Sequence, residues 1–217
     1  MPQSSDPTAA GRAALIRMSA ATPLVVAAQS FIFVRHGETD GNAQRIYQSA
    51  EQPLNARGLA QAEAAQRALV SLPVTCIRAS TMPRAWRTAE IVAAPHGLTP
   101  EPSDLLRERW FGDLVGTSSA NIDWAVDPPN GERLADFVER TRRGLVAALD
   151  RDDGNVVVAH GGNLHVLVHG LGADLPLALL GNATPIRFQR RSGGGWEATA
   201  IGPVHAPSGS AADGGIS

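Results

Sequence analysis

The chain has 217 residues, of which 43% are hydrophobic and 18% charged, and its formal net charge is −2 at pH 7. This composition is typical of a folded domain with its own core and excludes a chain that is disordered throughout. The weak net charge argues against a nucleic-acid partner, and the absence of a long apolar run argues against a membrane. A single cysteine, Cys76, excludes an internal disulfide bond, and we expect a cytoplasmic protein.

Residues 1–29 are rich in alanine and serine. Arg12 and Arg17 precede an apolar stretch at 24–28, an order that resembles a secretory leader. A Thr-Pro pair interrupts the apolar part, which is also shorter than a normal signal core. We therefore expect a disordered extension over 1–29, with a leader as the alternative.

The segment from residue 30 to residue 203 has the pattern of one domain, and the Gly- and Ser-rich tail 204–217 is expected to be disordered. Strands that alternate with helices imply right-handed crossovers, so we predict a doubly wound three-layer α/β/α sandwich with a mostly parallel sheet. The predicted elements are a strand at 31–34, a helix at 55–72, a strand at 74–77, helices at 83–94 and 132–149, a strand at 155–159, a helix at 163–171, and strands at 183–189 and 196–201.

The first predicted strand ends in an Arg-His-Gly motif, Arg35 to Gly37. Ligands of open α/β sheets bind beyond the carboxyl ends of the strands, which is where these side chains emerge. A guanidinium and an imidazole together suit a phosphate, and Gly37 would let backbone N–H groups approach an anion. A basic pair that ends a strand by chance is the alternative.

Two further strand ends carry polar side chains of the same kind. Ser80 and Arg84 follow the strand at 74–77, and His160 follows the strand at 155–159. Because the carboxyl ends of parallel strands share one edge, we expect these residues to meet His36 in a single crevice.

Five ordered blocks between about residue 31 and residue 190 resemble the histidine phosphatase superfamily, the group that includes the cofactor-dependent phosphoglycerate mutases. The blocks are 35–39 (RHGET) followed by Asn42, 53–62 (PLNARGLAQA), 79–89 (ASTMPRAWRTA), 105–112 (LLRERWFG) and 156–162 (VVVAHGG). The resemblance implies a fold and a site, and it carries roles onto the matching positions only.

On this resemblance, His36 is the nucleophile that forms a phosphohistidine, and Arg35 and Arg84 bind the phosphoryl group. His160 is the second histidine, expected to act as a cation on a phosphoryl oxygen. Glu108 is the general acid that protonates the departing alkoxide and then serves as base on water. From composition alone, a solvated surface glutamate between two arginines is the alternative for Glu108.

Further substrate contacts are assigned to Asn42, Gln48, Ser49 and Gly161. Asn42 also suits a helix cap or turn, and Ser49 stands where the family usually carries a glycine. Arg45 is open between a supporting charge and a solvated side chain. An apolar or stacking wall is expected from Trp110, Trp124, Ile122 and Val126.

No metal and no cofactor are predicted. His165 and His169 lie four residues apart on one predicted helix, a spacing that suits a metal, but a site needs three or four ligands. We therefore assign both histidines to a structural role. Glu38 is expected to orient its loop.

The predicted function is a metal-independent phosphomonoester hydrolase that acts through phosphohistidine on a small-molecule phosphomonoester. A cofactor-dependent phosphoglycerate mutase is the first alternative, but residues 112–130 contain no Lys or Arg to bind a substrate carboxylate. A non-catalytic phosphate-binding module is the second, disfavoured because His36, Glu108 and His160 are all present. A secreted acid phosphatase is disfavoured by the single cysteine. The substrate and the oligomeric state stay open.

Overall fold

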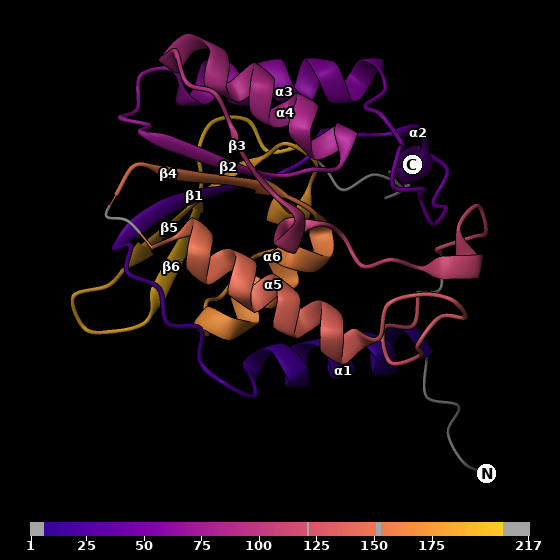
Figure 1. Cartoon of the computed structure of the whole chain (residues 1–217). Coiled ribbons are helices and arrows are strands. Elements are labelled where there is room, and N and C mark those ends of the chain that lie inside the picture. The colour runs from indigo at the N-terminus through magenta and orange to yellow at the C-terminus, as the bar shows by residue number, and fades with distance from the viewer. Residues whose placement is uncertain (1–6, 121, 151–152, 206–217) are drawn as a thin grey trace, which may run out of the picture.

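A computed structural model of the chain describes residues 7–120, 122–150 and 153–205. A six-stranded sheet forms the middle layer, with strand order β3-β2-β4-β1-β5-β6 (Figure 1). The strands are β1 (Ser30–Arg35), β2 (Cys76–Ser80), β3 (Glu101–Ser103), β4 (Asn155–Ala159), β5 (Pro185–Arg190) and β6 (Trp196–Ala200).

Four neighbouring strands of the sheet run parallel, and the two at one edge run antiparallel. β3, β2, β4 and β1 pair in parallel, with Val34 of β1 opposite Val158 of β4. β5 and β6 form a hairpin that pairs antiparallel with β1. The predicted α/β sandwich with a mostly parallel sheet is therefore confirmed. The order β2-β4-β1 also brings the carboxyl ends of three parallel strands side by side.

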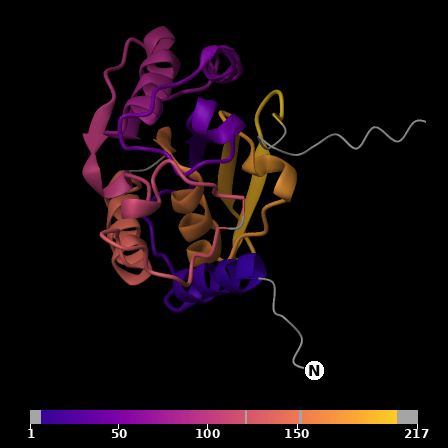
Figure 2. The same ribbon diagram turned by 90° about the vertical axis from the view of Figure 1, so that its right-hand side faces the viewer.

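Helices cover both faces of the sheet (Figures 1 and 2). The helices α3 and α4 bury one face, in a core that includes Val34, Leu69 and Val156. The other face carries α1, α5 and α6, in a larger core that includes Phe33 and Phe137. The helices are α1 (Pro7–Ala20), α2 (Asp40–Ala43), α3 (Ala56–Leu69), α4 (Pro83–Ala93), α5 (Leu134–Ala148) and α6 (Gly161–Leu171). No helix of the described residues combines the length and the apolarity that crossing a membrane requires.

The predicted elements are present, with small differences at their ends. Asn55 caps α3 as expected, because its side chain accepts a hydrogen bond from the backbone N–H of Gly58 at 2.8 Å. β2 begins two residues later and ends three residues later than predicted; just before it, the backbone N–H of Thr75 donates to the carbonyl of Gly154 at 3.0 Å. α6 begins two residues earlier, separated from β4 only by His160.

The prediction of a disordered extension over 1–29 is wrong for the described residues 7–29. They form α1 and an ordered connection to β1. Leu15 is fully buried, and Leu24, Val26 and Ala28 also join the core on that face. The backbone N–H of Leu24 donates to the carbonyl of Gly170 in α6 at 2.7 Å. Burial of these side chains is what orders the segment. Residues 1–6 and most of the predicted tail, 206–217, lie outside the described residues.

Candidate active site

The sheet brings the predicted chemical groups together at one edge. Arg35 is the last residue of β1, and His36 follows it. Ser80 ends β2, and His160 lies between β4 and α6. The rings of His36 and His160 are 5.0 Å apart between centroids and meet edge to face. The three distant strand ends therefore meet, but of their residues only Arg35, His36 and the nearby Arg84 line the cavity described below, whereas Ser80 and His160 are not among its lining residues.

His36 is held with one ring nitrogen free. Its Nδ1 lies 2.7 Å from the carbonyl of Gly37, and because a carbonyl only accepts, Nδ1 carries the proton. The lone pair is then on Nε2. Burial, followed by the charges of Arg84 and Arg35, lowers the pKa of His36 well below its usual 6.5. The imidazole is neutral at pH 7, which is the state required for attack.

Two arginines bring positive charge beside His36. Arg84 is 3% exposed and donates from Nη1 to the carbonyls of Ser49 and Ala50, at 3.1 and 3.3 Å. Burial lowers the pKa of Arg84 to about 10, so the group stays charged at neutral pH. Arg35 is half-buried and donates from Nη1 to the carbonyl of Leu180 at 2.8 Å.

Two buried donors here have no protein partner. Among the described residues, the buried polar atoms without a hydrogen bond include Arg35 Nε and Arg84 Nε, and both arginines line the cavity described below. A buried polar group without a partner costs free energy, so such atoms tend to mark a ligand site. Two guanidinium donors suit the oxygens of a phosphoryl group.

His160 lies beneath the crevice and is fully buried. Its Nε2 is 2.8 Å from the hydroxyl of Ser80. Burial lowers the pKa of His160 well below 6.5, and the charges of Arg84, His36 and Arg35 act in the same direction. The structure therefore favours a neutral ring, in contrast to the expected cation. A bound dianion would act in the opposite direction and raise the pKa of His160.

Glu108 faces the same crevice from the segment between β3 and α5. Its two carboxylate oxygens accept from the backbone N–H groups of Arg109 and Gly162, each at 3.0 Å. A Cβ on Gly162 would lie 2.3 Å from Oε1, so only glycine lets the carboxylate sit against the start of α6. This half-buried, doubly bonded position differs from that of a solvated surface glutamate.

A cavity of about 310 Å³ joins these groups. His36, Arg35, Arg84 and Glu108 line one part of it. The outer wall is largely apolar and aromatic, as expected for Trp110, Trp124 and Ile122, whereas Val126 is not among the lining residues. The remaining lining residues include Ile46, Tyr47, Phe111, Arg45, Ser119 and His165.

The lesser predicted contacts fall into two groups. Asn42, Gln48 and Gly161 all line the cavity. Asn42 also serves the cap, because its Oδ1 accepts from the backbone N–H of Thr39 at 3.2 Å. Ser49 is exposed and reaches the site through its carbonyl, which binds Arg84, so a substrate contact of its side chain stays a prediction.

Gly37 serves a different purpose from the one expected. Its N–H donates to the hydroxyl of Thr88 at 3.1 Å, so the N–H is already used within the protein. A Cβ on Gly37 would lie 2.3 Å from the carbonyl of Gly58, and this close approach of two backbones is what requires glycine. Glu38 is buried, and Asn55 donates to its carboxylate at 3.2 Å, which agrees with an orienting role.

His165 and His169 stack in parallel, with ring centroids 6.0 Å apart. Among the described residues, no group of three or more His, Cys, Asp or Glu side chains is arranged to hold a metal ion. The sequence did not indicate that His165 would reach the cavity, since its helix was expected to be core-like.

Other supporting residues were missed because they act across long stretches of chain. Asn182 donates to the carbonyl of His36 at 2.9 Å and to Asn42 at 3.2 Å. Arg109, a candidate cation by sequence, is 2% exposed and fully engaged by backbone carbonyls and Asp127. No local pattern distinguishes such residues from ordinary surface side chains.

Comparison with known proteins agrees with this geometry. A family model described as the histidine phosphatase superfamily (branch 1) matches residues 31–196. The chain belongs to this superfamily. The match begins at β1, so α1 lies outside the region that defines the superfamily.

Individual relatives carry several different activities. The chain is 29% identical to a 2,3-bisphosphoglycerate-dependent phosphoglycerate mutase of Beijerinckia indica, over 74% of this chain and 91% of the relative. It is 30% identical to an agropine synthesis reductase of Rhizobium rhizogenes, over 74% of this chain but only 39% of that longer protein. Among solved structures, a mycobacterial glucosyl-3-phosphoglycerate phosphatase in complex with VO3 has a TM-score of 0.63 and 26% identity, covering 82% of this chain and all of that one.

Proposed function

We propose that the protein is a phosphatase that hydrolyses a small-molecule phosphomonoester through a phosphohistidine on His36. The observation that carries the proposal is the neutral His36 ring, with a free Nε2, beside the half-buried Arg35 and the buried Arg84, whose buried Nε donors have no protein partner. These groups offer a nucleophile and the positive charge that a transferring phosphoryl group needs. Because arginines supply that charge, we propose that no metal ion takes part.

The reaction divides into two displacements. His36 Nε2 attacks phosphorus, the N–P bond forms and the bond to the leaving oxygen breaks, while Glu108 gives its proton to that oxygen. A water molecule then attacks the phosphohistidine, loses its proton to Glu108, and releases phosphate as the N–P bond breaks. Arg35 and Arg84 bind the phosphoryl oxygens in both steps, and His160 assists beneath them.

The contacts of the arginines favour hydrolysis over a mutase reaction. A mutase must also bind the carboxylate of phosphoglycerate in the outer cavity. Arg109 is engaged by carbonyls and Asp127, and Arg87 is exposed and pairs with Glu90 at 3.0 Å. Arg45 and Arg109 both line the cavity. Arg45 is exposed and makes one hydrogen bond, from Nη2 to the carbonyl of Ala120 at 3.3 Å, so its other N–H groups could bind a substrate. The aromatic outer wall suits an uncharged organic leaving group better than a carboxylate.

The test compares the two reactions of the full chain. Phosphate release is measured on a panel of metabolite phosphomonoesters with and without EDTA, beside the interconversion of 3- and 2-phosphoglycerate primed with 2,3-bisphosphoglycerate. We expect phosphate release that EDTA leaves unchanged and slower mutase turnover. Mutase turnover above hydrolysis, with kcat/KM above about 10⁴ M⁻¹s⁻¹, would contradict the proposal. We place this activity in the cytoplasm, with no nucleic-acid or membrane partner.

A further inference from the structure

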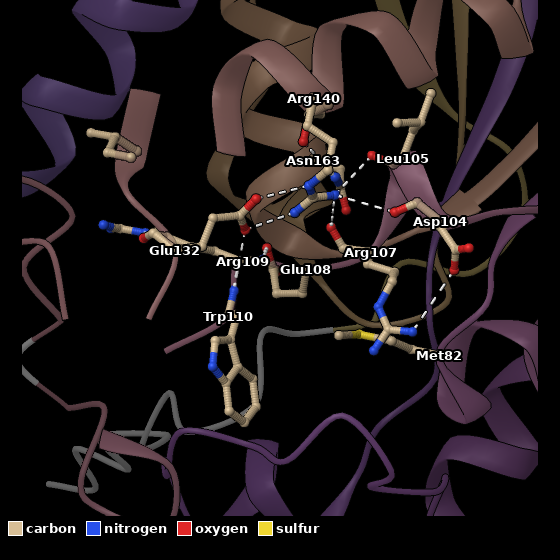
Figure 3. Close-up of polar contacts among 12 residues, drawn as sticks. Met82, Asp104, Leu105, Arg107, Glu108, Arg109, Trp110, Glu132, Arg140 and Asn163 are labelled. Carbon is tan, nitrogen blue, oxygen red and sulfur yellow. Dashed lines mark hydrogen bonds and ion pairs between the residues drawn. The ribbon is translucent and has the colours of Figure 1, made fainter. Parts of the chain in front are cut away.

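Arg140 of α5 inserts its guanidinium into the segment that carries Glu108 (Figure 3). Its Nη1 donates to the backbone carbonyls of Leu105 and Arg107, both at 2.9 Å, and to that of Asp104 at 3.4 Å. These carbonyls belong to the first two residues of the short 3₁₀ helix η2 (Asp104–Leu106) and to the residue before Glu108. The carbonyl of Arg107 is part of the peptide bond to Glu108, so this contact holds the backbone at the proposed acid.

The other edge of the same guanidinium binds Glu132. Arg140 Nε and Nη2 donate to the two carboxylate oxygens of Glu132, each at 2.8 Å, in a bidentate pair. Glu132 in turn accepts from the backbone N–H of Trp110 at 3.3 Å, and its own N–H donates to the carbonyl of Trp110 at 2.8 Å. The two side chains therefore hold the backbone on both sides of Glu108, at residues 107 and 110 (Figure 3).

This arrangement depends on the shape of arginine. Only a planar fork can bind a carboxylate through two atoms and backbone carbonyls through a third. The pair is partly buried, with 23% of the Arg140 side chain and 18% of the Glu132 side chain exposed. Compared with hydrophobic residues of similar volume, a buried salt bridge contributes little net stability, although removal of one partner alone is destabilising.

We propose that Arg140, together with Glu132, is a positioning residue that fixes the backbone of Glu108 so that its carboxyl stays at the bond being broken. The inference rests on the proposed function, in which Glu108 is the general acid. Small displacements of a reacting group cost large factors in rate, which makes such a clamp valuable. Arg140 itself does not touch the substrate.

The test uses the dependence of rate on the leaving group. Protonation matters for an alkyl phosphate, whose alkoxide leaves poorly, and little for para-nitrophenyl phosphate, whose phenolate leaves readily. We expect Glu108→Gln to lose about 10²–10⁴-fold in kcat/KM on the alkyl ester and far less on the aryl ester. Arg140→Lys should lose roughly 10–100-fold on the alkyl ester and under about 3-fold on the aryl ester, since the acid is misplaced rather than removed. Added to Glu108→Gln, it should cause no further selective loss.

Arg142→Lys is the matched control. Arg142 lies on the same helix, two residues on, and donates to the carbonyls of Ser19 and Pro23 at 3.3 and 3.0 Å, away from the cavity. We expect this variant to keep the leaving-group dependence of the native protein. Glu132→Gln weakens the pair between Arg140 and Glu132 from the other residue. It should reproduce the selective loss on the alkyl ester, so the proposal can still be tested if Arg140→Lys does not fold.

The outcomes separate the two proposals. Equal losses on both esters in Arg140→Lys and in Glu132→Gln would overturn the positioning role, because general damage to the fold does not distinguish leaving groups. Equal losses in Glu108→Gln would instead show that the acid role within the proposed function is wrong. A selective loss in Glu108→Gln without one in either clamp variant overturns the positioning role alone.

Discussion

Histidine side chains in and around the cavity are held neutral by their surroundings. Burial is the largest cause of the lowered pKa of His36, His160, His165 and His169. The proposed attack by His36 requires its neutral form, and Arg84 and Arg35, the proposed phosphate ligands, add to burial in lowering the pKa of His36. In the free protein the positive charges of Arg35 and Arg84 repel each other, and a bound anion would reduce that repulsion.

The same effect makes stability depend on pH, and His165 provides the test. Burial, then His169, Arg12 and Arg35, lowers the pKa of His165 to about 4, against about 6.5 in the unfolded chain. Between these values the unfolded chain binds the proton and the folded chain does not. The contribution to stability is thus complete above pH 6.5 and is lost as the pH falls toward 4.

We therefore expect the Tm of the native protein to fall more steeply between pH 6.5 and 4.5 than that of His165→Gln. The difference between the two proteins at pH 8, where His165 is neutral in both states, sets the baseline. Thermal melts across the range check this. Parallel Tm curves would contradict the shift attributed to His165.

At the scale of elements, α1 lies outside the region that matches the family model and packs against the loop of the cavity wall that carries Trp124. Gly11 of α1 packs against the loop that carries Trp124, and a Cβ there would lie 2.5 Å from the backbone N of Trp124 and 2.3 Å from the carboxylate of Asp123. Trp124 packs in turn on Phe111 and Phe137, with ring centroids 5.7 and 5.9 Å apart. The helix thereby supports one side of the cavity.

Replacement of Gly11 by alanine tests this contact, because the free energy of unfolding should fall if the contact is present and rise if it is absent. In an unobstructed helix, Gly→Ala stabilises by about 1 kcal/mol, whereas overpacking costs about 1–3 kcal/mol. We expect Gly11→Ala to lower the free energy of unfolding in urea and to raise KM for aryl phosphates. Gly193→Ala, whose Cβ meets nothing within 4 Å, is the control and should change stability by less than about 0.5 kcal/mol. A more stable Gly11→Ala protein would show that the contact is absent.

Elements with strong local patterns could be predicted, and those that depend on packing could not. The apolar runs of β1 and β4 and the apolar stripe of α5 mark each element by itself. α1 is different: its alanines and serines resemble an extension, and it is ordered by Leu15 in the core and by contact with α6. β3 is too short and polar to predict, because pairing with β2 defines it.

The same distinction applies to the site. His36, Arg84 and His160 could be predicted because each lies at or near the end of a strand, inside a block that resembles the family. The residues that contact the backbone of the site, such as Arg140 next to Glu108 and Asn182 at His36, form hydrogen bonds across 33 and 146 positions of sequence. No periodicity or motif records such a contact.

In the whole molecule, the order of the strands in the sheet brings segments that are far apart in the sequence to one site. The strand order β2-β4-β1 places three carboxyl ends next to one another. The antiparallel strands β5 and β6 continue the sheet beyond β1 (Figure 1). Helix layers on both faces keep these ends fixed, while loops and α1 build the outer wall. The proposed catalytic residues therefore lie within the region that matches the family model, whereas α1, at one side of the cavity wall, lies outside it.

The most direct test of the account is to identify the residue that carries the phosphoryl group during turnover. The full chain is mixed with its best monoester, quenched without acid because phosphohistidine is acid-labile, and mapped by mass spectrometry. The account predicts a phosphoryl group on His36, absent from His36→Ala and longer-lived in Glu108→Gln with an aryl ester. A phosphoryl group on any other residue, or its persistence in His36→Ala, would contradict it.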